Sequence, residues 1–215
     1  MKKLFFLGLV VGLVLSLSSV AHAFTILNSG FESPMVNGGD PDNWWGMRGD
    51  PTKTDVVMKS SSDFAHSGNL SGKTVMSALS GGNQWAGWGQ SLDILAGDPI
   101  QASAWLKVTD TSGIKGPKVQ IEFKDAMGNA NGVTYAQAPV GTFDWMQLTT
   151  PAGVVAPTGT VSAVVNLLVE KGSSGGTGTF YWDDAAVTGS AVPEPASLLL
   201  LGSGLVGMFG LRRKK

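Results

Sequence analysis

The stretch "IQASAWLKV", residues 100–108, alternates strictly between apolar and polar side chains. Successive side chains of a β-strand point to opposite faces, so this alternation predicts a strand with one face on a core. The apolar face would be made of Ile100, Ala102, Ala104, Leu106 and Val108. The opposite, polar face would carry Trp105 between Ser103 and Lys107.

The same alternation recurs further along the chain. Val119, Ile121 and Phe123 repeat it, and so does the stretch Val161–Val169, while no stretch between the chain ends shows a persuasive apolar period of 3.6. Turn-forming sequences separate these stretches at residues 96–99, 111–117, 125–132 and 171–178. Short strands at such spacing predict one all-β domain over residues 24–189, an antiparallel β-sandwich of the jelly-roll type.

The N-terminus has the features of a secretory signal peptide over residues 1–23. Lys2 and Lys3 precede an apolar run, and the small-residue sequence "AHA" ends at Ala23, which predicts cleavage before Phe24. The alternative is a retained membrane anchor, although the run is short for a spanning helix.

A second apolar segment closes the chain, in the sequence "VPEPASLLLLGSGLVGMFGLRRKK" from residue 192. Residues 196–211 predict an apolar helix, and the basic tail 212–215 would stay on the cytoplasmic side of a membrane. The arrangement resembles the PEP-CTERM sorting signal, whose motif is matched by Val192, Pro193, Glu194 and Pro195. The resemblance implies that residues 190–215 tether a precursor to the inner membrane. It also implies that an exosortase-type protease processes the precursor and that the mature form reaches the cell surface or extracellular matrix.

The part of the chain between these signals is acidic and has no cysteine. Between Phe24 and Pro195 the chain carries nine of the 15 Lys and Arg residues but all 16 Asp and Glu residues, so the formal charge of this stretch is −7. Nucleic acids and anionic lipids require clustered cations, and we therefore exclude them as partners. Disulfides, which an exported protein could form, are impossible here.

Catalytic motifs are weak. His66 is the only histidine after Ala23, too few for an ordinary zinc site. The "GSSGG" match around Ser174 lacks the helix that a nucleophile elbow requires. Glu32, Glu122 and Glu170 offer carboxylates without a glycosidase motif. We therefore expect no enzyme, with a hydrolase as a minor alternative.

Polar strand faces that carry tryptophan favour sugar binding, because indole rings stack on the C–H face of pyranoses while amides bond the hydroxyls. The first candidate surface combines Trp105 with Gln120, Glu122 and Asn166. Further candidates are Trp145 and Trp45. In the pairs Trp44/Trp45 and Trp85/Trp88, the sequence leaves open which ring is exposed, and core packing is the alternative role of each.

Several stretches resemble carbohydrate-binding modules of families four and nine and their galactose-binding-like relatives. They include "ILNSGFESP" (26–34), "AHSGNLSGKTV" (65–75), "IQASAWLKV" (100–108) and "YWDDAAV" (181–187). The resemblance implies glycan binding and a structural Ca²⁺ between the first and last strands. Its carboxylate ligands would be Glu32 and Asp183, and carbonyls of the turn 66–69 would add oxygen ligands.

The alternative for this acidic pair is that Asp183 caps backbone N–H groups and no metal binds. Strand alternation predicts that Asp183 and Asp184 face opposite sides, with Asp184 toward solvent or a basic neighbour. The expected function is that of an exported, non-catalytic protein that binds exopolysaccharide or another surface glycan. The alternative function is that of a structural surface protein which contacts other proteins.

Overall fold

The computed structural model describes residues 24–33, 40–78, 82–172 and 175–189. The predicted signal peptide, the sorting signal with its apolar helix, and Ser174 lie outside these ranges. Residues 23–190 form one compact unit. Within the described ranges, no helix has the length and apolar character needed to cross a membrane.

Ten strands form the described part of the chain, and every strand pairing within it is antiparallel. They are β1 (Trp45–Arg48), β2 (Val56–Ser61), β3 (Ser71–Met76), β4 (Trp85–Leu92), β5 (Ile100–Ser112), β6 (Lys118–Lys124), β7 (Ala130–Gln137), β8 (Phe143–Thr149), β9 (Ser162–Glu170) and β10 (Thr177–Gly189).

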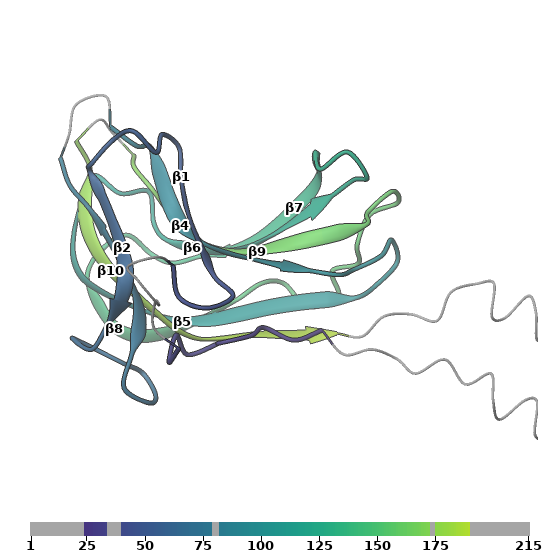
Figure 1. Ribbon diagram of the computed structural model, residues 1–215, viewed down its shortest axis with the longest axis horizontal. Coiled ribbons are helices and arrows are strands. Elements are labelled where there is room, and N and C mark those ends of the chain that lie inside the picture. Colours follow the sequence, from purple (N-terminus) through teal and green to yellow (C-terminus); the bar gives the residue numbers. More distant parts are fainter. Residues whose placement is uncertain (1–23, 34–39, 79–81, 173–174, 190–215) are drawn as a thin grey trace, which may run out of the picture. The chain divides into compact units, whose positions relative to one another are not determined.

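The strands make two five-stranded sheets that lie in two layers (Figure 1). Sheet I has the order β1-β4-β9-β6-β7, and sheet II has the order β2-β3-β10-β5-β8. The prediction of an all-β, two-sheeted sandwich is confirmed. Figure 1 also shows that sheet I curves, because β1 and β7 rise on either side of β9 and β6 on the side away from sheet II.

The alternating stretches supply the core, as predicted. All five apolar positions of residues 100–108 are at most 2% exposed, and Val119, Ile121 and Phe123 are equally buried. Ala163, Val165, Leu167 and Val169 have no exposed surface. Val161 differs from the prediction, because it precedes β9 and is exposed.

Aromatic rings from the first half of the chain extend this core. Phe31 has no exposed surface, and its ring stacks on Trp44 at 5.0 Å and meets Trp88 edge-on at 5.7 Å. The ring lies so close to Gly72 that a Cβ there would come within 2.6 Å of it. Trp44 and Trp88 are therefore the inward members of their pairs, and the open question about exposure is answered for both.

Hydrogen bonds tie the segment before β1 to both sheets. The side chain of Gln90, in β4, accepts from the Leu27 backbone N–H at 2.7 Å and donates to the Leu27 carbonyl at 2.9 Å. The N–H of Ala185, in β10, donates to the Ser29 carbonyl. The core, the ladders and these ties all lie within residues 24–189, so this part contains what it needs to fold by itself.

A buried ion pair joins the end of β9 to the entry of β2. The Lys171 ammonium lies 2.8 Å from a carboxylate oxygen of Asp55, and neither side chain is exposed to solvent. Lys171 also donates to the Ser77 carbonyl, and Asn83 donates to the second Asp55 oxygen at 2.9 Å. Burial opposes ionisation of Asp55, but the hydrogen bonds from Lys171 and Asn83 outweigh it and lower the pKa of the carboxyl.

Candidate functional site

Five residues form a straight line across the outer face of sheet I. Trp45 in β1 pairs with Gly89 in β4, Gly89 pairs with Asn166 in β9, Asn166 pairs with Gln120 in β6, and Gln120 pairs with Tyr135 in β7. Directly paired residues of antiparallel strands share a face. Because their strand neighbours fill the core, these five residues share the outer face. We call them the cross-strand row.

The two ends of the row are aromatic and open to solvent. Trp45 is 37% exposed and Tyr135 is 51% exposed. The Trp45 indole lies over Gly89, since a Cβ at Gly89 would be 2.8 Å from the indole nitrogen. Glycine therefore provides the space in which this indole lies against the sheet, leaving its other face outward.

The middle of the row is made of amides. Gln120 is partly exposed, whereas Asn166 is only 3% exposed. The Asn166 side-chain oxygen is buried and has no hydrogen-bond partner among the residues that the structure describes. A buried acceptor without a partner is costly, so a turn of this amide toward solvent, where its oxygen can accept from a ligand hydroxyl or a water molecule, would be favoured.

Charged groups on this face are neutralised by each other. The Lys118 ammonium lies 2.7 Å from Glu170, and Lys124 lies 2.9 Å from Glu122. Lys118 also lies 5.2 Å from the centre of the Tyr135 ring, within cation–π range. The row therefore runs between two ion pairs, and the charges within each pair neutralise one another.

The structure brings together only part of the predicted sugar-binding surface. Gln120, Glu122, Asn166 and Trp45 all belong to the outer face of sheet I. Trp105 does not, because β5 pairs with β10 and β8 in sheet II. The prediction of one surface that joins Trp105 to Gln120, Glu122 and Asn166 is therefore wrong. Alternation showed correctly that each residue faces away from the core, but it does not assign strands to sheets.

Trp105 and Trp145 instead surround the imidazole of His66 on the outer face of sheet II. His66 stacks on Trp105 with ring centres 3.9 Å apart, and it meets Trp145 edge-on at 5.5 Å. His66 belongs to the connection between β2 and β3, which crosses this face. One face of the Trp105 indole is consequently covered by the protein itself.

Both acids of the "DD" pair meet the same connection. The side chain of Asp184 contacts the His66 imidazole nitrogen Nδ1 at 2.6 Å and accepts a hydrogen bond from the Ser67 hydroxyl at 2.6 Å. Asp183 accepts from the backbone N–H groups of His66 and Ser67 at 2.7 and 3.1 Å. The prediction that the two acids face opposite sides is wrong. A bulge between Asp183 and Ala186, with Asp184 at φ +44°, interrupts the alternation.

Glu32 holds the second half of the same turn. One of its carboxylate oxygens accepts from the N–H groups of Asn69 and Leu70 at 2.7 and 2.8 Å. Glu32 approaches Gly68 so closely that a Cβ there would meet its carboxylate. Glu32 and Asp183 together thus grip the turn 66–70 from two sides, and we call this arrangement the carboxylate clamp.

The carboxylate clamp does not fit a calcium ion. The turn presents N–H donors to both carboxylates, where a calcium site would need carbonyl oxygens among its 6–8 ligands. The other Asp183 oxygen accepts from the Asp184 N–H at 2.8 Å. Among the described residues, no group of three or more His, Cys, Asp or Glu side chains is placed to hold a metal. Asp183 thus caps backbone N–H groups of the turn, as the capping alternative predicts for its side chain.

Sequence reasoning missed two members of the cross-strand row. Tyr135 follows the turn at 125–132, in a strand whose outward residues Val133 and Tyr135 are both apolar or aromatic and exposed. Such a strand has no simple apolar–polar alternation. Gly89 carries no side chain and therefore no chemical signal. Its role depends wholly on the ring of Trp45, which lies over it from the neighbouring strand β1.

Comparison with known families supports the sorting prediction. Residues 191–214 match the model of the PEP-CTERM protein-sorting motif. The chain therefore carries this signal, which includes Val192–Pro195, and the signal indicates an exported protein with a membrane-anchored precursor. No curated protein sequence matches the chain significantly.

Solved structures of carbohydrate-binding modules share the fold of the body. The CBM22-1 xylan-binding domain of Xyn10C from Paenibacillus barcinonensis has a TM-score of 0.52 and 15% identity, with 81% of this chain and 100% of that domain covered. Another module, from a study of promiscuous carbohydrate-binding modules of the β-sandwich superfamily, has a TM-score of 0.53 at 14% identity and covers 74% of this chain and 60% of that one.

A similar sandwich also forms part of a larger enzyme chain. The enzymatically active domain of tailspike protein 4 from bacteriophage CBA120 matches with a TM-score of 0.53 and 22% identity over 76% of this chain. The match spans only 21% of the tailspike chain. At these identities the likeness establishes a β-sandwich of the type found in carbohydrate-binding modules, and the site must decide between binding and catalysis.

Proposed function

We propose that this protein is an exported, non-catalytic glycan-binding protein whose cross-strand row holds a polysaccharide of the cell surface or extracellular matrix. The observation that carries the proposal is the pairing register of the five strands of sheet I. It places two exposed aromatic rings at the ends of one line and two amides between them, one with an unpartnered oxygen.

The row suits a sugar chain laid across sheet I. The outward face of Trp45 offers a stacking surface for the C–H face of a pyranose, and Tyr135 offers a second at the far end. Gln120 can donate to and accept from ring hydroxyls, and a hydroxyl that reaches Asn166 would satisfy its buried oxygen. The curvature of sheet I, with β1 and β7 rising at its edges, favours contact with an extended ligand (Figure 1).

The carboxylates on this face favour binding over hydrolysis. A glycosidase uses one carboxyl group as acid and another as base or nucleophile on opposite sides of the scissile bond. Glu122 and Glu170 are each paired with a lysine of β6, so neither is a free carboxyl group beside the row. This arrangement supports a binding role.

The sorting motif indicates where the protein would meet its ligand. A PEP-CTERM signal would deliver the sandwich through the inner membrane, with processing by an exosortase-type protease. Such a protein would meet the exopolysaccharide that surrounds the producing cell. That polymer is therefore the ligand we propose, and the binding of a matrix glycan on sheet I would retain the protein in a biofilm.

The test is retention of purified residues 24–190 on gels that contain the native exopolysaccharide of the producing bacterium. Trp45→Ala is expected to reduce retention about tenfold, because an aromatic stacking contact contributes about 0.5–1.5 kcal/mol beyond the area that it buries, and about 1.4 kcal/mol is a factor of ten. Trp105→Ala is the matched control, since it removes an indole from the opposite sheet and should leave retention unchanged. No retention of the unaltered body, together with self-association at high concentration, would instead support the structural-protein alternative. Equal loss in both variants would reject the row as the site.

A further inference from the structure

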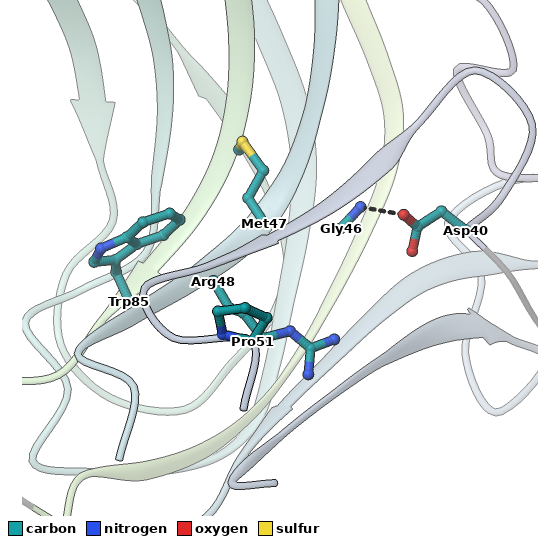
Figure 2. Close-up of a pocket in the computed structure, with 6 residues that line it drawn as sticks. All are labelled: Asp40, Gly46, Met47, Arg48, Pro51 and Trp85. Carbon is teal, nitrogen blue, oxygen red and sulfur yellow. Dashed lines mark hydrogen bonds between the residues drawn. The ribbon is translucent and has the colours of Figure 1, made fainter. Parts of the chain in front are cut away.

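A pocket of about 540 Å³ lies at the edge of sheet I beside the Trp45 end of the cross-strand row (Figure 2). It is lined by Asp40, Gly46, Met47, Arg48, Pro51 and Trp85. None of these residues belongs to the row.

Met47 connects the pocket to the row. It lies two positions beyond Trp45 in β1, on the same outer face, and pairs with Gly87. A Cβ at Gly89 would lie 3.0 Å from the Met47 sulfur as well as beside the Trp45 indole. Because β1 is the edge strand of sheet I, a glycan that extends along the row past Trp45 and bends over this edge would reach the pocket within one or two sugar residues, since two strand positions span about 7 Å.

Arg48 gives the pocket its chemical character. Arg48 pairs with the buried Ala86, so its side chain leaves the edge strand β1 on the side toward sheet II. There its guanidinium donates one hydrogen bond, to the Val56 carbonyl of β2 at 3.3 Å. Among the described residues it takes part in no ion pair, whereas Lys73, Lys107 and Lys118 each have a carboxylate partner. Most of the planar fork is thus free to bind a carboxylate through two parallel hydrogen bonds.

The other walls suit a sugar ring. Trp85 is 38% exposed, and its indole and the Pro51 ring supply apolar surface. Asp40 is the one acid in the lining, and its Oδ2 accepts from the Gly46 N–H at 2.7 Å. Figure 2 shows Trp85 and Asp40 at opposite sides of the pocket, with the Arg48 side chain extending past Pro51 between them. Asp40 would accept a sugar hydroxyl at the end away from the indole.

We infer that this pocket binds a carboxylate-bearing sugar residue, a uronic acid, of the glycan that lies on the cross-strand row. Arg48 holds the carboxylate and Trp85 packs against the pyranose ring. The inference rests on the proposed glycan-binding function and narrows it to acidic polysaccharides. The acidic body as a whole repels such polymers, so recognition depends on this one cation, whose field is screened beyond about 8 Å at physiological salt.

The experiment compares polymers that differ only in the carboxylate. Retention of residues 24–190 is measured on native exopolysaccharide and on glucuronoxylan, each before and after chemical reduction of its uronate carboxyls to alcohols. The expected result is about tenfold stronger retention on at least one polymer before reduction. Arg48→Gln should abolish this preference, and Arg48→Lys should keep part of it as the conservative variant. Thermal unfolding of each variant shows whether the fold is intact.

The outcomes separate this inference from the function on which it rests. Retention that is equal before and after reduction, yet lost in Trp45→Ala, overturns the acidic-sugar pocket and leaves the glycan-binding function standing. A preference for carboxylate that persists in Arg48→Gln also overturns the assignment to this pocket. Absence of retention on all four polymers rejects both proposals.

Discussion

The indole of Trp45 lies over the backbone of Gly89 on the neighbouring strand, with the indole nitrogen 2.8 Å from where a Cβ of residue 89 would stand. Such a separation is shorter than any ordinary contact between carbon and nitrogen. The orientation of the ring that we propose as a sugar platform therefore depends on a residue that would itself touch no sugar.

Gly89→Ala is predicted to weaken glycan retention without removing any group that contacts the ligand. The added methyl group would lift or turn the indole, and misplacement of a stacking surface is expected to reduce affinity about three- to thirtyfold. The measurement is retention on native exopolysaccharide beside Trp45→Ala. Ser91→Ala is the control, because Ser91 is exposed on the same strand and face. Wild-type retention by Gly89→Ala would show that the position of the ring is not important.

The carboxylate clamp gives a prediction about pH. Burial raises the pKa of Asp183 from its ordinary 3.8 to about 6, against the opposing effect of the three backbone N–H groups that donate to it. Between about pH 4 and 6, the folded protein thus holds a proton on Asp183 that the unfolded chain has released. Unfolding free energy must fall as pH rises through this window, by at most about 3 kcal/mol from this group.

Urea unfolding of residues 24–190 at pH 4.5, 5.5 and 7 would measure this dependence. Asp183→Asn cannot ionise, so its stability should change less across the window than that of the unaltered protein, whatever its absolute value. The difference between the two profiles isolates Asp183 from every other titrating group. Parallel profiles would mean that Asp183 is ionised throughout.

The same clamp predicts indifference to calcium. Because N–H donors occupy both carboxylate oxygens of Asp183 and one of Glu32, a chelator should leave the melting temperature of residues 24–190 unchanged within about 1 °C. Millimolar calcium should have as little effect, since only a ligand that binds the folded state stabilises it. A fall of several degrees in chelator, reversed by calcium, would show that the turn rearranges to offer carbonyls.

Alternation within single strands predicted much of this fold, because burial of one face is a local property. The five apolar residues of 100–108 needed no partner strand to be recognised, and the inward or outward side of Trp105 and Gln120 followed from the same rule. Their separation into different sheets did not, because it depends on which distant strands pair. β5 and β6 follow one another in the sequence, but β5 belongs to sheet II and β6 belongs to sheet I.

The candidate site was less predictable for a related reason. Asp183 and Asp184 violate alternation at a bulge, where a backbone torsion of a non-glycine residue in the left-handed region turns both carboxylates toward one turn. The pairing of Trp45 with Gly89 and of Asn166 with Gln120 requires the register of four strands. Arg48 was invisible as a pocket residue because nothing in its sequence neighbourhood indicates that it lacks an ionic partner.

The buried ion pair between Lys171 and Asp55 predicts an asymmetry between single and double substitutions. Lys171→Met would leave the Asp55 carboxylate buried with only Asn83 beside it, at a cost of about 3–5 kcal/mol in unfolding free energy. Combining Lys171→Met with Asp55→Asn removes both charges and should recover at least half of that loss.

Urea unfolding of the two single variants and the double variant at pH 7 measures the coupling. A double variant whose loss equals the sum of the single losses would mean that the two groups act independently. The pair joins β9 of sheet I to the entry of β2 in sheet II, so the coupling reports directly on what holds the two layers together at this end of the sandwich.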